Sequence, residues 1–195
     1  NTAVRKQIFV TLMSARGAQD AFEHLQKLRL TGKNDREIPK VVCECAAREK
    51  EFNPFYADVA CHLCAANRQH CITFRFIFWD IFRAIADSSL PKRVRSRDRR
   101  RALNTARVMA ALVKGFHLSL STFKAFETIG SDSEENPFGH SLWVKACDVN
   151  AAPQLSLFLH SFFFALLSDR TCSESDFIAI IDRVATSKVR CSITH

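Results

Sequence analysis

Apolar residues recur at every third or fourth position along most of this 195-residue chain, and few residues interrupt that spacing. Such a period places an apolar stripe along one face of a helix, whereas a half-buried strand alternates at every second residue. Glycine and proline number only 5 each, which is too few for the tight turns that usually join strands. The sequence therefore predicts an all-α fold in which short polar loops connect successive helices.

The predicted helices follow one another closely, which indicates stacked antiparallel helix hairpins of the HEAT-like kind, in repeats of roughly 40 residues. Gly32 is expected to end the second helix, and Pro39 to lie in the first turn of the third. Asn34 and Asp35 are candidate caps of the third helix and Thr73 of the fifth, while Asp20 is expected to be either the N-cap or a first-turn anion of the second. The expected helices span about 3–14, 18–30, 36–48, 54–68, 74–87, 98–114, 119–128, 138–147, 152–168 and 174–187.

We expect residues 1–130 to form the helical-repeat domain, with a basic insertion near residues 90–101. Residues 131–195 hold an acidic loop and further helices that either complete this domain or are appended to it. The apolar stretch from Leu155 to Leu167 is shorter than the roughly 20 residues that cross a bilayer, so it predicts a buried helix and no membrane partner. Because the chain does not begin with methionine, we expect it to be part of a longer protein.

The net charge of +8 is concentrated in one run, since seven cations within residues 92–101 are offset there only by Asp98. Cations at this density do not pack inward, and arginine, which dominates the run, grips phosphate through two hydrogen bonds. The run is therefore predicted to contact RNA, while a nuclear-localisation signal, an acidic partner or a solvated loop remain alternatives. The candidate RNA-binding residues are Lys92, Arg93, Arg95, Arg97, Arg99, Arg100 and Arg101.

The phenylalanine-rich stretch from Phe74 to Phe82 allows two interpretations. Exposed aromatic rings can serve as a stacking platform for nucleic-acid bases. The same spacing suits the two faces of a helix buried inside the protein, and we favour this second interpretation.

The 8 cysteines lie within apolar helical patterns, which is typical of reduced, buried thiols. On a helix, Cys43 and Cys45 would point about 200° apart and could not share a metal ion. Cys61 and Cys64 would share a face, but structural zinc sites generally draw such pairs from turns. We therefore expect no metal and no cofactor, with a zinc-dependent nucleic-acid module as a minor alternative. No phosphate-binding glycine loop, nucleophile elbow or paired-carboxylate pattern is present, so no enzyme activity or small-molecule substrate is expected.

Several strings, in their order and spacing, resemble the MA-3 domain of the nucleolar MIF-4-G-domain protein family. Among them, Asn53-Pro54-Phe55-Tyr56 and Phe76-x-x-Trp79-Asp80 favour the nucleolar branch over relatives in translation initiation and splicing. The chain departs from the family pattern at Gly17 and Ala18, at Pro39 and in the arginine-rich run. The strings lie within residues 5–14, 20–23, 35–38, 43–45, 49–50, 53–56 and 73–80.

The resemblance implies an MA-3 helical repeat that acts as a non-catalytic scaffold in small ribosomal subunit biogenesis in the nucleolus. The implied partners are pre-ribosomal RNA, protein assembly factors and a DEAD-box RNA helicase of the initiation factor 4A type. It also implies that the first two hairpin loops meet the helicase at one edge of the repeat, through Gln19, Asp20, Asp35 and Arg36. The alternative is a translation or splicing adaptor of the same fold that binds such a helicase outside the pre-ribosome.

Overall fold

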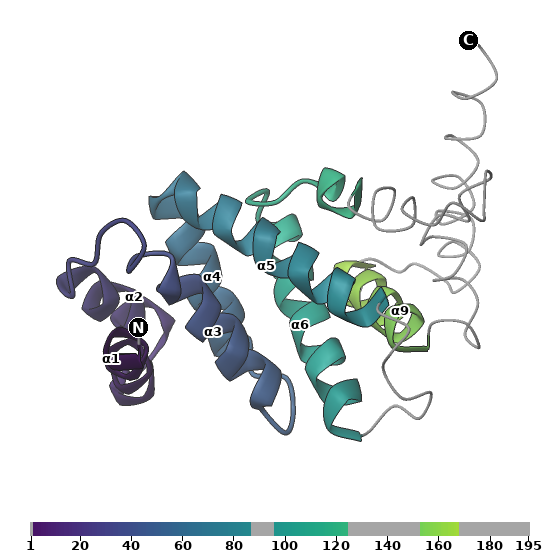
Figure 1. Cartoon of the computed structure of the whole chain (residues 1–195), viewed down its shortest axis with the longest axis horizontal. Coiled ribbons are helices and arrows are strands. Elements are labelled where there is room, and N and C mark those ends of the chain that lie inside the picture. Colours follow the sequence, from purple (N-terminus) through teal and green to yellow (C-terminus); the bar gives the residue numbers. More distant parts are fainter. Residues whose placement is uncertain (1, 87–95, 125–152, 168–195) are drawn as a thin grey trace, which may run out of the picture.

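The computed structural model describes residues 2–86, 96–124 and 153–167, and every regular element within these ranges is a helix (Figure 1). The prediction of an all-α fold is therefore confirmed. The elements are α1 (Thr2–Ser14), α2 (Ala18–Lys27), α3 (Glu37–Arg48), α4 (Pro54–Ala66), α5 (Arg68–Ala86), α6 (Ser96–Lys114), the short 3-10 helix η1 (Leu120–Lys124) and α9 (Pro153–Leu167).

The first four helices form two stacked pairs. Helix α1 packs against α2, and α3 packs against α4, while α1 contacts α3 and α2 contacts α4 across the two pairs. Helices α5 and α6 both pack on α3 and α4. Helix α4 is therefore enclosed by four neighbours, and its apolar residues Val59, Ala60 and Leu63 are buried.

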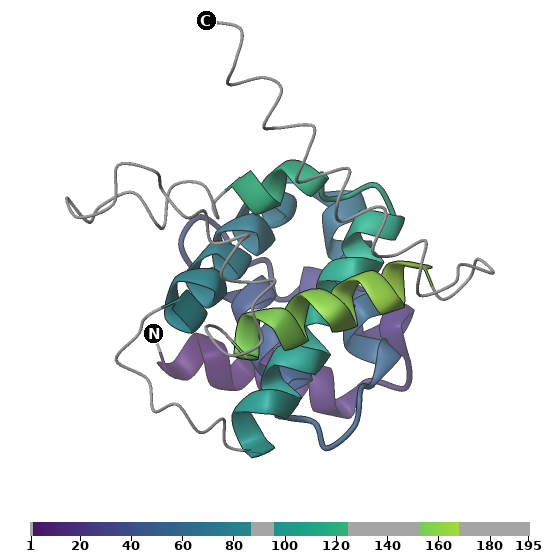
Figure 2. The ribbon, with the colours of Figure 1, turned by 90° about the vertical axis from the view of Figure 1, so that its right-hand side faces the viewer.

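Helix α9 lies across α6 in Figure 2 and packs against both α6 and α5. Its side chains Phe158 and Phe162 are fully buried. The Phe158 ring meets the Phe82 ring edge to face at 5.3 Å, and the Phe162 ring meets the Phe123 ring at 5.0 Å. Edge-to-face rings at such distances contribute packing energy beyond their buried area. The expected buried helix near residues 152–168 is thus confirmed, and it shares one aromatic core with α5 and η1.

The end of α2 differs from the expectation. The helix stops at Lys27, and the left-handed backbone conformation that follows a helix end is adopted by Arg29, at a φ of 46°. Gly32 also has a positive φ, 59°, but it lies within the turn that leads to α3. The prediction that Gly32 ends the second helix is therefore wrong, because the chain tolerates a non-glycine residue in this conformation at Arg29.

The start of α5 is also earlier than expected. Asn67 caps this helix by accepting a hydrogen bond from the Gln69 amide at 2.9 Å, and the helix begins at Arg68. Thr73 lies inside the helix, where its hydroxyl donates to the Gln69 carbonyl oxygen at 2.9 Å. A threonine hydroxyl often bonds back to the carbonyl four residues earlier, so its presence alone does not mark a helix start.

Other boundaries agree with the sequence pattern to within about two residues. Pro39 occupies the third position of α3 and is buried, as its expected place in the first turn requires. Asn53 caps α4 by accepting a hydrogen bond from the Phe55 amide at 3.0 Å. The elements expected at 138–147 and 174–187, and the end of the one expected at 119–128, lie outside the described residues.

Candidate nucleic-acid and partner interface

The basic run leads into the start of α6. Because this helix begins at Ser96, Arg99, Arg100 and Arg101 lie in its first two turns, and all three are exposed. Consecutive residues on a helix point about 100° apart, so these three guanidinium groups spread around the helix end rather than facing a single point. Of the other predicted residues, Lys92, Arg93 and Arg95 lie outside the described residues, and Arg97 lies on α6 with a side chain that is outside the description.

Asn104 holds the middle of α6 against the end of α3. Its side chain is only 4% exposed, and its Nδ2 atom donates to the carbonyl oxygens of Ala46 and Glu49, each at 3.1 Å. The last carbonyl groups of a helix lack a partner four residues on, and the Glu49 amide reaches the Ala46 carbonyl only at 3.4 Å, so the bonds from Asn104 satisfy acceptors at this helix end. This contact fixes the basic start of α6 beside the α3–α4 loop.

Arg100 and Arg107 lie four residues before and three residues after Asn104, so all three share one face of α6. The guanidinium carbon of Arg107 lies 5.5 Å from the centre of the Phe52 ring in the α3–α4 loop. Lys50 in the same loop is exposed. The loop also carries Glu49 and Glu51, so the positive charge of this edge comes from α6, whose exposed arginines are suited to a phosphate-bearing partner.

Sequence reasoning identified the arginines but missed Asn104, Arg107 and Phe52. An asparagine inside an apolar helical pattern is a signal of a buried polar contact. The hydrogen-bond partners of Asn104 could not be predicted from the sequence, because the Ala46 and Glu49 carbonyls lie more than fifty positions away along the chain.

The two candidate residues of the first hairpin lie at the start of α2 and make local contacts. Asp20 accepts a hydrogen bond from the Arg16 amide at 2.9 Å and lies 3.5 Å from His24 Nε2. The N-cap position itself is occupied by Gly17, so Asp20 is a first-turn anion rather than the cap. Gln19 is exposed and donates to Glu23 Oε1 at 2.9 Å.

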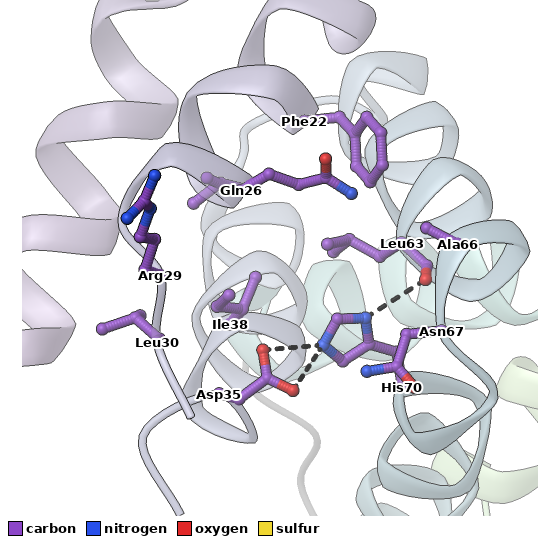
Figure 3. A pocket seen from close by; sticks show the side chains of 11 residues that line it. Phe22, Gln26, Arg29, Leu30, Asp35, Ile38, Leu63, Ala66, Asn67 and His70 are labelled. Atoms are coloured by element: carbon purple, nitrogen blue, oxygen red, sulfur yellow. Dashed lines mark hydrogen bonds and ion pairs between the residues drawn. The ribbon is translucent and has the colours of Figure 1, made fainter. Parts of the chain in front are cut away.

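Asp35 lies in the α2–α3 loop and faces His70 of α5 (Figure 3). His70 Nε2 is 3.1 Å from both carboxylate oxygens of Asp35, and its Nδ1 is 3.1 Å from the Leu63 carbonyl oxygen. The expectation that Asp35 caps α3 is wrong, because Arg36 is the N-cap residue and no side chain bonds the helix start. The Asp35 carboxylate is used instead to tie the α2–α3 loop to α5.

The His70–Asp35 pair lies in a pocket of about 290 Å³, which Phe22, Leu25 and Ile38 also line. The pocket separates the end of α2 from the start of α5, and Asp35 and His70 close one side of it (Figure 3). The Asp35–His70 contact supports the α2–α3 loop, while the polar side chains of Gln26 and Arg29 line the pocket on the side of α2.

The four candidate residues of the hairpin loops do not share one edge. Gln19 and Asp20 lie at the start of α2, while Asp35 and Arg36 follow its end. A helix rises 1.5 Å per residue, so the ten residues of α2 separate the two loops by about 15 Å. The expectation of a single edge is therefore wrong, because consecutive loops of a helix hairpin fall at opposite ends.

The thiols on α3 are poor nucleophiles. Burial raises the pKa of Cys43 to about 12 and the pKa of Cys45 to about 11, so both are protonated near neutral pH. Across the described ranges, no three His, Cys, Asp or Glu side chains gather as a metal site would require. Among these same residues, no helix combines the length and apolar character needed to cross a bilayer.

Comparison with known proteins places this geometry in a family. The sequence model of the MA3 domain matches residues 4–119, which extends the resemblance well past the strings read within residues 5–80. Human Nucleolar MIF4G domain-containing protein 1 is 39% identical over 127 residues, which is 65% of this chain and 14% of that protein. Its Drosophila melanogaster homolog is 40% identical over 92 residues, covering 47% of this chain and 10% of that protein.

Suppressor of glycerol defect protein 1 of Saccharomyces cerevisiae is 37% identical over 90 residues, covering 45% of this chain and 10% of that protein. The chain thus matches between 10% and 14% of the length of these three relatives. Two of the three carry the word nucleolar in their names. Because the family model covers more than half of the chain and the observed fold is entirely helical over that match within the described residues, the chain belongs to the MA3 domain family.

Proposed function

We propose that this chain is a non-catalytic adaptor in nucleolar small ribosomal subunit (18S rRNA) biogenesis. It docks on protein assembly factors, on precursor ribosomal RNA and on a DEAD-box helicase of the initiation factor 4A type. The observation that carries this proposal is the 39% identity over 127 residues to a relative named as nucleolar. Since the chain corresponds to 14% of that relative, it supplies one binding module of a larger machine.

The RNA contact in this proposal is the positively charged start of α6. Arg99, Arg100 and Arg101 are exposed there, and no carboxylate whose side chain the structure describes lies within ion-pair distance of them. Each cation that approaches a phosphate releases a condensed counterion, so this binding weakens steeply as the salt concentration rises. The other four cations of the run extend the same charge along the chain.

The helicase contact in this proposal uses both hairpin loops. Gln19 and Arg36 are exposed and contact the helicase directly. Asp20 and Asp35 position the loops through their contacts with the Arg16 amide and with His70. Because α2 separates the loops by about 15 Å, they touch two regions of the helicase and hold these in a fixed relative orientation.

The proposal also assigns α9 to the same unit as residues 2–124. The buried rings of Phe158 and Phe162 meet Phe82 and Phe123, so removal of α9 would expose the aromatic core. An appended helix would instead contact the preceding domain through a mainly polar surface.

The experiment that tests the proposal is crosslinking of the tagged full chain to RNA in cells, followed by sequencing of the attached RNA. Wild type is compared with a variant in which Arg99, Arg100 and Arg101 are changed to Ala. The matched control changes the three exposed lysines Lys6, Lys27 and Lys33 to Ala and removes the same charge elsewhere.

We expect crosslinks concentrated in small-subunit precursor RNA that are lost in the arginine variant and kept in the lysine control. Crosslinks dominated by messenger or spliceosomal RNA would move the chain to an adaptor role outside the pre-ribosome. Equal loss in the two variants would show that net charge, rather than the start of α6, determines the contact.

A further inference from the structure

Helix α5 carries aromatic residues on two faces, and only one of these faces is covered. Phe74, Phe78 and Phe82 are fully buried in the core, as the sequence predicted. Phe76 lies two residues from Phe74 and therefore points to the opposite side of the helix. Its side chain is 50% exposed, so the interpretation that the whole stretch is buried is wrong at this position.

Phe76 belongs to an aromatic–arginine cluster that consists of Arg75, Phe76 and Trp79. The guanidinium carbon of Arg75 lies 5.8 Å from the centre of the Phe76 ring and 5.3 Å from that of Trp79. The two rings are 5.3 Å apart and nearly perpendicular, with an interplanar angle of 88°. Trp79 Nε1 donates to the Thr122 carbonyl oxygen at 2.7 Å, which fixes the tryptophan ring against η1.

Arg75 is held by these rings and not by an acid. Among the described residues, no carboxylate lies within ion-pair distance of Arg75, and its enclosed Nε atom has no hydrogen-bond partner. Arg68 and Arg83 lie seven residues before and eight residues after Arg75, on the same side of α5. Both are exposed, and Arg83 lies 3.1 Å from Asp80. The outer face of α5 is therefore a positively charged stripe with exposed aromatic surface at its centre.

The composition of this stripe favours nucleic acid over protein as its partner. Asp80 and Arg83, one and two turns after Phe76 on α5, are exposed and charged, so the ring is bordered on this side by charge rather than by a broad apolar patch. Protein interfaces usually need such a patch, in which an anchor becomes fully desolvated. An isolated ring beside a guanidinium plane matches the way in which unpaired bases stack on aromatic and arginine side chains.

We propose that the outer face of α5 binds unpaired RNA, with a base stacked on the aromatic–arginine cluster and phosphates beside Arg68 and Arg83. This inference rests on the proposed RNA-binding function and adds a second site to it. The start of α6 recognises phosphate charge in any strand, whereas the cluster recognises exposed bases. The chain therefore prefers RNA whose bases are not paired.

The test uses the full chain and a mixed-sequence 12-nucleotide RNA, either single-stranded or annealed to its complement. Fluorescence anisotropy gives the dissociation constants for wild type and for Phe76→Ala. The matched control is Phe116→Ala, which removes an aromatic ring that is 96% exposed in the loop between α6 and η1. Trp79 fluorescence is followed in a Trp143→Phe background, because these are the only two tryptophans of the chain.

We expect Phe76→Ala to weaken single-strand binding about tenfold, because loss of one stacked base has an effect of this size. Its salt dependence and its affinity for the duplex should remain those of wild type, and Phe116→Ala should change neither. The single strand should quench Trp79 fluorescence. The Arg99, Arg100 and Arg101 variant should instead lose affinity for both RNAs and show a shallower salt dependence.

The inference is overturned if Phe76→Ala binds the single strand as wild type does, while the α6 variant still loses affinity. That result leaves the proposed function intact and limits RNA contact to α6. It is also overturned if a glutamate-rich peptide quenches Trp79 and the single strand does not, since the surface then binds protein. A tenfold effect of Phe76→Ala, together with cellular crosslinks outside the pre-ribosome, would support the inference and refute the proposed function.

Discussion

Replacement of Asn104 with Ala is expected to destabilise the fold by about 2 kcal/mol, because two hydrogen bonds are lost at a buried site. The Nδ2 atom of Asn104 donates to the Ala46 and Glu49 carbonyl oxygens. After the change, the Ala46 carbonyl keeps a longer bond from the Glu49 amide at 3.4 Å. No other donor among the described residues bonds the Glu49 carbonyl. Loss of the bond to the Ala46 carbonyl costs about 1 kcal/mol. Loss of the bond to the Glu49 carbonyl costs slightly more, because that acceptor is left unpaired.

Asn104→Asp provides a sharper test of the same geometry. The aspartate places an acceptor where the amide donated, so that three oxygens face one another at a nearly inaccessible position. A buried, unpaired charge is more costly than a lost hydrogen bond. We therefore expect Asn104→Asp to destabilise the fold more than Asn104→Ala at pH 7.

The assay is urea denaturation of the full chain, with the free energy of unfolding obtained by linear extrapolation. Asn67→Ala is the matched control, because it makes the same chemical change at the exposed cap of α5 and removes one hydrogen bond. Loss of such a cap costs about 1 kcal/mol. If Asn104→Ala costs no more than the control, or if Asn104→Asp is more stable than Asn104→Ala, then Asn104 does not donate to the two carbonyl oxygens.

Asp35→Ala is expected to cost about 1 kcal/mol through loss of its contact with a histidine, whereas the exposed neighbour change Arg36→Ala should cost almost nothing in the same denaturation assay. Tyr56→Phe removes a hydrogen bond of 2.9 Å to Glu49 and should cost about 1 kcal/mol at pH 7. Burial raises the pKa of the Tyr56 phenol in the fold, so this advantage of wild type should decline as pH rises above the ordinary tyrosine pKa of about 10, and a constant difference would contradict the assignment. Iodoacetamide at pH 8 should modify Cys43 far more slowly in the folded chain than in urea, because burial raises its pKa to about 12, and equal rates by peptide mass spectrometry would show that the thiol is accessible.

The sequence allowed most of the helices to be predicted, because apolar period and polar breaks determine where a helix can exist. Helices α1, α3, α4 and α9 begin and end within about two residues of the expected positions. The predicted start of α5, near residue 74, is six residues later than the observed start at Arg68. Asn67 and Thr73 are both acceptable caps, and local preference alone does not choose between them. The end of α2 was misplaced because a positive φ was assigned to Gly32, while the chain adopts it first at Arg29.

The charge of the candidate site could be predicted from the sequence, because a dense run of arginines remains at the surface in any fold. Which surface surrounds them was not predictable, because the contact of Asn104 with Glu49 joins residues 55 positions apart. The same limit applies to α5. A helical period shows that Phe74 and Phe76 point to opposite sides, but only the packing of α5 on α3, α4 and α9 decides which side is covered.

Both candidate RNA contacts share one physical feature, which explains why a small helical module could bind tightly with few residues. Arg107 lies over the Phe52 ring, and Arg75 lies over the Trp79 ring, whose Nε1 bonds Thr122. An arginine loses considerable rotamer freedom on binding, and a side chain that is already restrained loses less. Changes at the anchors should therefore weaken RNA binding without altering the charge. Trp79→Phe keeps an aromatic ring but loses the bond to Thr122 and part of the ring surface beneath Arg75. If this change left the affinity for single-stranded RNA unchanged, restraint of the arginine would not contribute to recognition.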